Sequence, residues 1–289
     1  MFLLRRRPLY SSERFARGKR HAVYFLIGAL SLFLTGGWLL SWASYRKEMT
    51  IASIRVSGVD TFPAENVRAF AEEKLSGAYF RFWSRANSFL YPKKAIAEGL
   101  FTAFPRLAHV SVLRTGLREI SIQAEEREPS YLWCGETRPA EAGRTPCYFL
   151  DPQGIAFTRA PYFSGGVYFE IYGPFTGPRT PPAAFHEAPI GRSFFPTDEW
   201  RRVIMFKDAL ITAGLSPDTL VVETSGEASF LFPSGLRMVF SLSQDFDEAL
   251  QNLFAAVGTA PLTKEAFTLP EKNSFSYVDV RFKNRIFYK

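Results

Sequence analysis

The sequence predicts an α+β protein that begins with an N-terminal transmembrane helix, continues with a small β-α-α-β-β domain and ends with a β-rich domain that has an antiparallel or mixed sheet and flanking helices. Three observations predict it: an uncharged apolar run near the N-terminus, alternating and helical hydrophobic patterns after it, and a Pro- and Gly-rich stretch followed by more short alternating segments. The 289 residues, 47% of them hydrophobic, suffice for two ordinary domains with cores.

The apolar run covers residues 22–44 and contains no Asp, Glu, Lys or Arg. A membrane-spanning helix needs about 20 such residues, whereas the apolar part of a cleaved secretory signal has about 7 to 15. Trp38, Trp42 and Tyr45, at the C-terminal end of this run, form an aromatic belt of the kind found at membrane interfaces. We therefore predict a retained transmembrane helix over residues 22–45.

The positive charge is concentrated before this helix. Seven Lys or Arg and one acid lie between Met1 and His21, which leaves 28 Lys/Arg and 27 Asp/Glu for the rest of the chain. The positive-inside rule then predicts that residues 1–21 are a basic cytoplasmic tail and that the chain from Arg46 onward lies outside the cytoplasm. Since the larger part has no basic excess to attract phosphates, we expect no nucleic-acid partner.

A first domain is predicted over residues 50–128. Apolar residues alternate in the strands and recur at helical spacing in the helices, with Gly77 and Pro105 as helix stops. The predicted elements are a strand at 51–58, helices at 63–77 and 93–105, and strands at 109–113 and 119–125. An aromatic insert at 79–91 is open to three interpretations: a contact patch, core filling or contact with the membrane surface.

A second domain is predicted over residues 129–289. Its first part, up to Pro196, is rich in Pro and Gly and indicates loops around a few short strands, such as residues 167–171. The later elements are helices at 197–214 and 245–257, strands at 220–224, 228–232 and 237–241, and a terminal pair of strands. Cys134 and Cys147 lie on the predicted outer side, where both a disulfide and two unpaired thiols remain open.

The last strand, predicted at Arg285 to Tyr288, has no sequence after it to cover its free edge. An uncovered edge offers unpaired N–H and C=O groups to an incoming strand, and aromatic side chains there add contact area. The alternative is a strand that only completes the sheet, with its Lys and Arg residues as a guard. The candidate partner-binding residues are Tyr277, Val278, Asp279, Arg281, Phe282, Arg285, Ile286, Phe287 and Tyr288.

Sequence patterns that would indicate catalysis are weak in this chain. Ser44 to Lys47 fits S-x-x-K, but at the membrane boundary and without the S-D-N and K-T-G strings that accompany it in penicillin-binding enzymes. The three His residues lack the spacing of a zinc site, and the acidic clusters lie at a strand end and a helix start, where solvation and capping explain them. We expect no catalytic residue, metal, cofactor or small-molecule substrate.

Several motifs together resemble the FtsQ/DivIB family of bacterial cell-division proteins. The motifs are Pro105 closing the second helix, the V-x-V strand at 110–112, E-R-x-P at 126–129, L-D-x-x-G at 150–154 and the closing strands 277–282 and 284–288. The resemblance implies that residues 50–128 form a POTRA domain and that residues 129–289 form the family's β domain.

The resemblance also implies a function. Proteins of this family are bitopic, non-enzymatic scaffolds of the divisome in the cytoplasmic (inner) membrane at the division septum, and they bind FtsB-like and FtsL-like bitopic partners through the end of the β domain. The alternative is a POTRA-bearing component of protein secretion or outer-membrane assembly. Those proteins continue into a membrane β-barrel, and the 140 residues after Phe149 show no run of alternating ten-residue strands.

Overall fold

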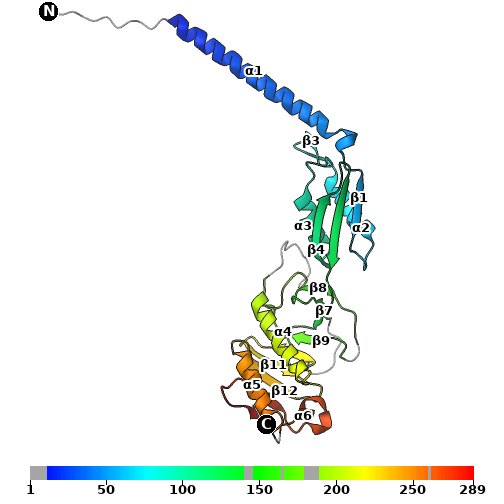
Figure 1. The fold of residues 1–289 in the computed structure, drawn as a ribbon, viewed down its shortest axis with the longest axis vertical. Coiled ribbons are helices and arrows are strands. Elements are labelled where there is room, and N and C mark those ends of the chain that lie inside the picture. Colours follow the sequence, from blue (N-terminus) through cyan, green and yellow to red (C-terminus); the bar gives the residue numbers. More distant parts are fainter. Residues whose placement is uncertain (1–11, 140–145, 164–165, 179–188, 260–261) are drawn as a thin grey trace, which may run out of the picture. The chain divides into compact units, whose positions relative to one another are not determined.

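The computed structural model describes residues 12–139, 146–163, 166–178, 189–259 and 262–289 (Figure 1). It shows a mixed α+β chain with an apolar N-terminal helix and a large sheet, which confirms the fold class at that level. Most of the predicted cytoplasmic tail, His186 and much of the Pro- and Gly-rich loops (140–145 and 179–188) lie outside the described residues.

The chain divides into two compact units. One contains residues 1–57, 62–96 and 111–123, and the other contains residues 58–61, 97–110 and 124–289. The domain boundary expected between residues 128 and 129 remains a prediction.

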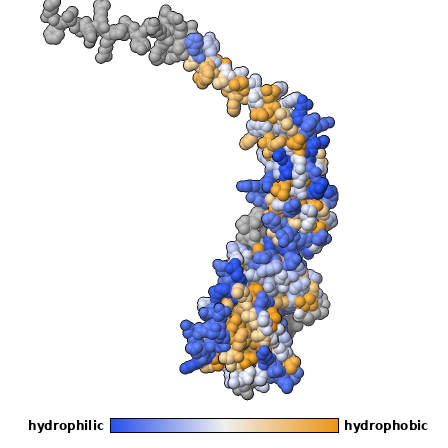
Figure 2. Space-filling model, in the orientation of Figure 1, coloured by the Kyte–Doolittle hydropathy of each residue, from blue (hydrophilic) through white to orange (hydrophobic). Residues whose placement is uncertain are grey.

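Helix α1 (Ser12–Ser44) contains, among the described residues, the one helix that is long and apolar enough to span a membrane, from His21 to Ser44. None of its most apolar window is buried inside the protein. Figure 2 shows hydrophobic side chains on the surface of this helix. An apolar helix whose side chains are exposed is stabilised by an apolar solvent, so α1 is compatible with a single membrane span.

A three-stranded sheet has the order β1-β5-β4, with β1 at Ser53–Ser57, β5 at Glu119–Glu126 and β4 at Leu107–Arg114. β1 and β5 are parallel, so Ile54 is opposite Ile120 and Val56 is opposite Ile122. Helices α2 (Ala64–Leu75) and α3 (Lys93–Ala103) lie between β1 and β4 in the chain, where the helical spacing predicts them. The unpredicted addition is a short hairpin between these helices, β2 (Ala78–Tyr79) with β3 (Trp83–Ser84).

The large sheet has nine strands in the order β14-β13-β12-β11-β10-β9-β6-β7-β8. Its bounds are β6 Tyr131–Trp133, β7 Tyr148–Leu150, β8 Ala156–Arg159, β9 Phe169–Tyr172, β10 Thr219–Val222, β11 Glu227–Leu231, β12 Arg237–Ser241, β13 Tyr277–Asp279 and β14 Phe287–Tyr288. Three neighbouring pairs are parallel: β6 with β9, β9 with β10, and β12 with β13. The sheet is therefore mixed.

Helices α4 (Thr197–Thr212) and α5 (Phe246–Ala256) are the crossovers that two of the parallel pairs require, since they connect β9 to β10 and β12 to β13. Between them the Phe206 and Phe246 rings stack with centroids 4.6 Å apart, and Phe240 from β12 lies 5.2 Å from Phe206. The side chain of Asp245 caps α5 by accepting the N–H groups of Asp247 and Glu248. This aromatic core fixes the sheet on which the C-terminal strands are built.

Two short helical turns, α6 (Glu265–Thr268) and η2 (Pro270–Lys272), follow α5, and a further turn, η1 (Lys47–Met49), follows α1.

A buried ion pair joins two of the motifs that carry the family resemblance. Arg127, in E-R-x-P, contacts Asp151, in L-D-x-x-G, and their side chains are 9% and 1% exposed. The Oδ1 atom of Asp151 also accepts the N–H groups of Gln153 and Ile155, both at 2.9 Å. Gly154 has φ +77° in this turn, and a Cβ there would lie 2.7 Å from the ring of Trp200. The carboxylate thus organises the β7–β8 turn and holds Arg127 against it.

Cys134 and Cys147 form a disulfide, which decides the question that the sequence left open. Cys134 is buried in a small apolar cluster with Leu132, Phe149, Phe157 and Tyr172. The bond therefore ties the segment after β6 to the start of β7 inside a packed region.

Glu126, at the end of β5, should make the stability of the protein depend on pH. Its carboxylate accepts the N–H groups of Asp60 (2.7 Å) and Thr61 (2.8 Å) and the hydroxyl of Thr61. Burial alone would raise the pKa of Glu126, but these hydrogen bonds and the nearby charge of Arg106 together lower it. A lowered pKa in the folded state means that the stabilisation is present above the unfolded pKa of about 4.3 and is lost as the pH falls through the folded value.

The measurement is the free energy of unfolding of the full chain between neutral and acidic pH. We expect Glu126→Gln to have a lower free energy of unfolding than wild type at neutral pH. We also expect that free energy to fall less in Glu126→Gln than in wild type when the pH is lowered. Glu125→Gln, at an exposed position on the same strand, is the matched control. Parallel pH curves for wild type and Glu126→Gln would contradict the assignment.

Candidate partner-binding edge

Strand β14 is the last strand of the nine-stranded sheet, and among the described residues no strand pairs with its outer side. It pairs with β13 antiparallel, with Val278 opposite Tyr288 and Asp279 opposite Phe287. The strand is shorter than the predicted Arg285 to Tyr288. Asn284 adopts φ +54°, a turn conformation that Asn tolerates better than most residues, and regular pairing starts only at Phe287.

The register shows which backbone groups are free. Tyr277 and Lys289 exchange both backbone hydrogen bonds, at 3.3 and 3.2 Å. Because hydrogen-bonded and non-hydrogen-bonded pairs alternate in an antiparallel ladder, Asp279 with Phe287 is again a bonded pair and Val278 with Tyr288 is not. The N–H and C=O groups of Tyr288 therefore point away from β13, toward the open edge.

Three exposed aromatic side chains accompany this edge. The rings of Phe282 and Phe287 are in contact edge to face, with centroids 5.0 Å apart, and Tyr288 contacts Phe275 in the same way at 5.1 Å. We call Phe282, Phe287 and Tyr288 the aromatic edge. Such side chains contribute large contact areas when a partner covers them.

The other predicted partner-binding residues differ in how far their side chains are exposed. The side chains of Val278 and Asp279 are buried, so they cannot contact a partner directly. Tyr277 is half-buried and Ile286 packs against the main core cluster. Arg285 is exposed and remains available.

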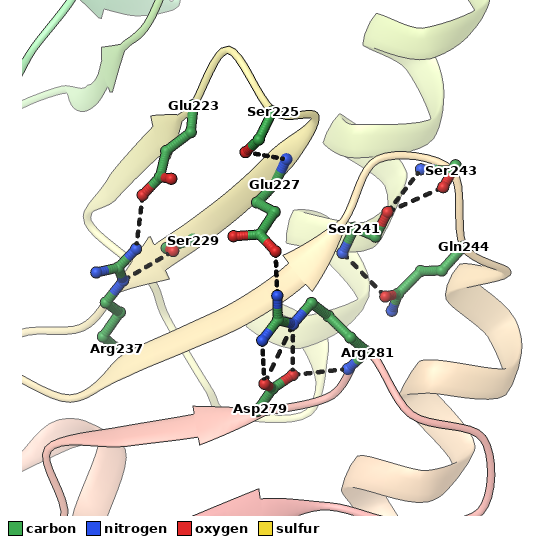
Figure 3. A network of polar contacts seen from close by, with 10 residues as sticks. All are labelled: Glu223, Ser225, Glu227, Ser229, Arg237, Ser241, Ser243, Gln244, Asp279 and Arg281. Atoms are coloured by element: carbon green, nitrogen blue, oxygen red, sulfur yellow. Dashed lines mark hydrogen bonds and ion pairs between the residues drawn. The ribbon is translucent and has the colours of Figure 1, made fainter.

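Arg281 is engaged within the protein (Figure 3). Its Nε lies 2.9 Å from Oδ1 of Asp279, one terminal nitrogen lies 2.6 Å from Oδ2, and the other contacts Glu227. The hydrogen bonds to Asp279 are the largest cause of a raised pKa of Arg281. Arg281 thus pairs with the protein's own acids, and this network braces β13 against β11.

A hollow of about 310 Å³ lies beside this network, between the start of α5 and residues 280–283. Gln244 is one of its lining residues, and its side chain accepts the N–H of Ser241 at 2.9 Å and donates to the carbonyl of Val280 at 3.3 Å. Asp245 and Glu248 line one side, and Arg281 and Lys283 line the other. Sequence reasoning missed these α5 residues because helix capping accounts for the acids and only the fold brings them to the C-terminal link.

The described residues hold no group of three or more His, Cys, Asp or Glu side chains that could bind a metal ion. Ser44, the serine of the S-x-x-K string, is buried, and its hydroxyl donates to the carbonyl of Ser41 at 2.7 Å and accepts the N–H of Ser84. That hydroxyl is therefore used in the structure of the helix end.

Neither models of known protein families nor curated proteins gave a match to this chain. The resemblance to the FtsQ/DivIB family thus remains a prediction from the motifs named above.

Proposed function

We propose that this chain is a non-enzymatic, bitopic scaffold of the bacterial divisome, which recruits FtsB-like and FtsL-like partners by strand addition at β14 and links division to septal wall synthesis. The observation that carries the proposal is the open edge of β14, where the free N–H and C=O groups of Tyr288 lie beside the aromatic edge. In this proposal α1 anchors the chain in the cytoplasmic membrane and residues 50–128 act as a POTRA domain.

Strand addition explains the combination of features at this edge. An incoming strand would satisfy the free backbone groups of Tyr288, and alternate side chains of that strand would meet the aromatic edge. Lys283, Arg285 and Lys289 are exposed around it. These cations discourage pairing between identical edges and favour a partner segment with acidic residues, since charge complementarity steers association and selects partners.

The proposed topology follows from the same chain. The basic residues precede α1 in the sequence, so in this proposal the N-terminus lies in the cytoplasm and the chain after α1 lies outside it. A disulfide at Cys134–Cys147 fits an oxidising, extracytoplasmic compartment.

Tyr288→Pro is the sharpest test of strand addition. Proline removes the outward N–H without breaking a bond to β13, because Tyr288 occupies a non-hydrogen-bonded position. Loss of one intermolecular hydrogen bond and of the ring should weaken binding about tenfold or more. The measurement is the Kd between the full chain in bilayer discs and purified FtsB-like and FtsL-like partners.

Tyr288→Ala is the matched control, since it removes the ring and keeps the N–H. We expect its affinity to lie between wild type and Tyr288→Pro. Near-ultraviolet circular dichroism must show that both variants retain the native fold. Equal affinities for Tyr288→Pro and Tyr288→Ala would eliminate backbone pairing at this edge. Binding of barrel-assembly proteins, with none of the bitopic partners, would favour the secretion and assembly class instead.

A further inference from the structure

The β2–β3 hairpin and the turn after it expose a cluster of large apolar side chains. Phe80 is 82% exposed and Phe82 is 61% exposed, and Phe89 and Leu90 are exposed nearby in the sequence. We call residues 78–90 the aromatic hairpin. Contiguous apolar groups on a protein surface mark a site of contact with a partner or a membrane.

The aromatic hairpin is hydrogen-bonded to the last turn of α1. The hydroxyl of Ser41 donates to the carbonyl of Phe82 at 2.5 Å, and the side chain of Asn87 donates to the carbonyl of Ser44 at 3.2 Å. The Ser44 hydroxyl accepts the N–H of Ser84, and Ser44, Ser84 and Asn87 are all buried. These bonds fix the height of the aromatic hairpin along the helix axis.

That height corresponds to a membrane interface. The 24-residue apolar segment from His21 to Ser44 is longer than the roughly 20 residues that cross the hydrocarbon core, so Ser41 to Ser44 lie at the outer boundary. Trp38 and Trp42 are exposed on the same part of α1, as expected at an interface. The carbonyl of Phe82, bonded to Ser41, then lies at the same depth.

The turn at the tip has a strained backbone. Phe80 and Arg81 both have positive φ, 49° and 67°, and the turn is closed by a 2.9 Å hydrogen bond from the N–H of Phe82 to the carbonyl of Tyr79. Such turns usually contain Asn and Gly, and a bulky residue with positive φ is an outlier. The result of this conformation is that Phe80 projects into the surroundings, which points to a role for its exposed ring.

The surroundings of the aromatic hairpin match a lipid leaflet. A groove of about 490 Å³ between the helix end and the hairpin is lined by apolar side chains, including Leu40, Met49, Trp83 and Leu90. Exposed cations accompany it: Arg46 lies over the ring of Trp42 at 3.7 Å, and Arg85 lies over the ring of Tyr79 at 5.3 Å. Exposed apolar side chains with cations beside them are the pattern of a membrane-surface anchor.

We infer that the aromatic hairpin is embedded in the outer leaflet of the membrane, with Phe80 and Phe82 among the acyl chains and Arg46, Arg81 and Arg85 at the lipid phosphates. The hairpin thereby fixes the membrane-proximal end of the first compact unit on the bilayer. The inference rests on α1 spanning a membrane and is independent of the divisome role.

The test uses the full chain in vesicles of phosphatidylcholine and phosphatidylglycerol. Because both native cysteines are in the disulfide, a single introduced cysteine can carry an environment-sensitive fluorophore. The labelled positions are Phe80→Cys and Arg81→Cys at the tip, Leu39→Cys in α1 and Met205→Cys on the exposed face of α4. Quenching is measured with lipids that carry a nitroxide at shallow or deep positions.

We expect the probes at both tip positions to be quenched most by shallow nitroxides, the Leu39 probe to be quenched by lipid, and the Met205 probe to be unaffected. Quenching at Leu39 without quenching at either tip position would overturn the inference and leave the membrane span intact. No quenching at Leu39 would remove the span and the inference with it. A blue-shifted tip emission without lipid quenching would show that a second copy of the chain covers the hairpin, which also overturns the inference.

Discussion

Asp151→Ala is expected to lower the free energy of unfolding by about 3–5 kcal/mol, because it leaves the guanidinium of Arg127 buried without a partner. The same change removes the acceptor for the N–H groups of Gln153 and Ile155 and so loosens the β7–β8 turn. Trp200 is a natural reporter of this loss, since its indole N–H donates to the carbonyl of Pro152 at 2.8 Å. The measurement is denaturant unfolding followed by tryptophan fluorescence.

Two further variants show whether the loss of stability comes from the buried ion pair or from the removal of any charged side chain. Asp198→Ala removes an exposed partner of Arg201 on α4 and should cost less than about 1 kcal/mol. Replacing both members, as Arg127→Met with Asp151→Leu, should recover much of the loss caused by the unpaired charge, although the turn bonds stay lost. If Asp151→Ala and Asp198→Ala cost the same, the carboxylate does not have the organising role described above.

Removal of the disulfide is the second large effect. Cys134→Ala with Cys147→Ala should lower the free energy of unfolding by about 3 kcal/mol, since a cross-link that closes a loop of this size restricts the unfolded chain by that amount. Reduction of wild type should reproduce the loss, and reduction of the double variant should change nothing. The measurement is the unfolding midpoint of oxidised and reduced protein.

The same disulfide can be used to test the proposed membrane topology in the cell. In the proposed orientation the two thiols resist alkylation unless a reductant is added, because the compartment outside the cytoplasm is oxidising. A chain whose export is blocked should show both thiols free. Free thiols in the correctly inserted protein would contradict the extracytoplasmic placement of this loop.

Much of the fold was predictable because many elements carry their own signals. Hydrophobic spacing with Gly or Pro stops indicates α2, α3 and α4, and alternation indicates β4, β5, β11 and β12. The strands β6 to β8 are only three or four residues long and lie among loops, so period-two alternation is too short to recognise there. The β2–β3 hairpin was missed because its turn residues, Phe80 and Arg81, are not those that usually signal a turn.

The candidate site was predictable as a segment but not as a set of contacts. Alternation places the aromatic residues near the end of the chain, yet it does not show that Asp279 is buried or that Arg281 is paired with Glu227, which lies 54 positions earlier. Such long-range ion pairs leave no local pattern. The hollow beside α5 was missed for the same reason, since its lining combines two segments that are distant in the sequence.

From β10 to β14 each strand lies next to the strand that preceded it in the chain. This part of the sheet can therefore grow strand by strand in the order in which the polypeptide is synthesised. At each stage the newest strand offers an unpaired ladder that the following segment fills. A partner that pairs with β14 would therefore repeat, between molecules, the same elementary step by which the sheet itself is assembled.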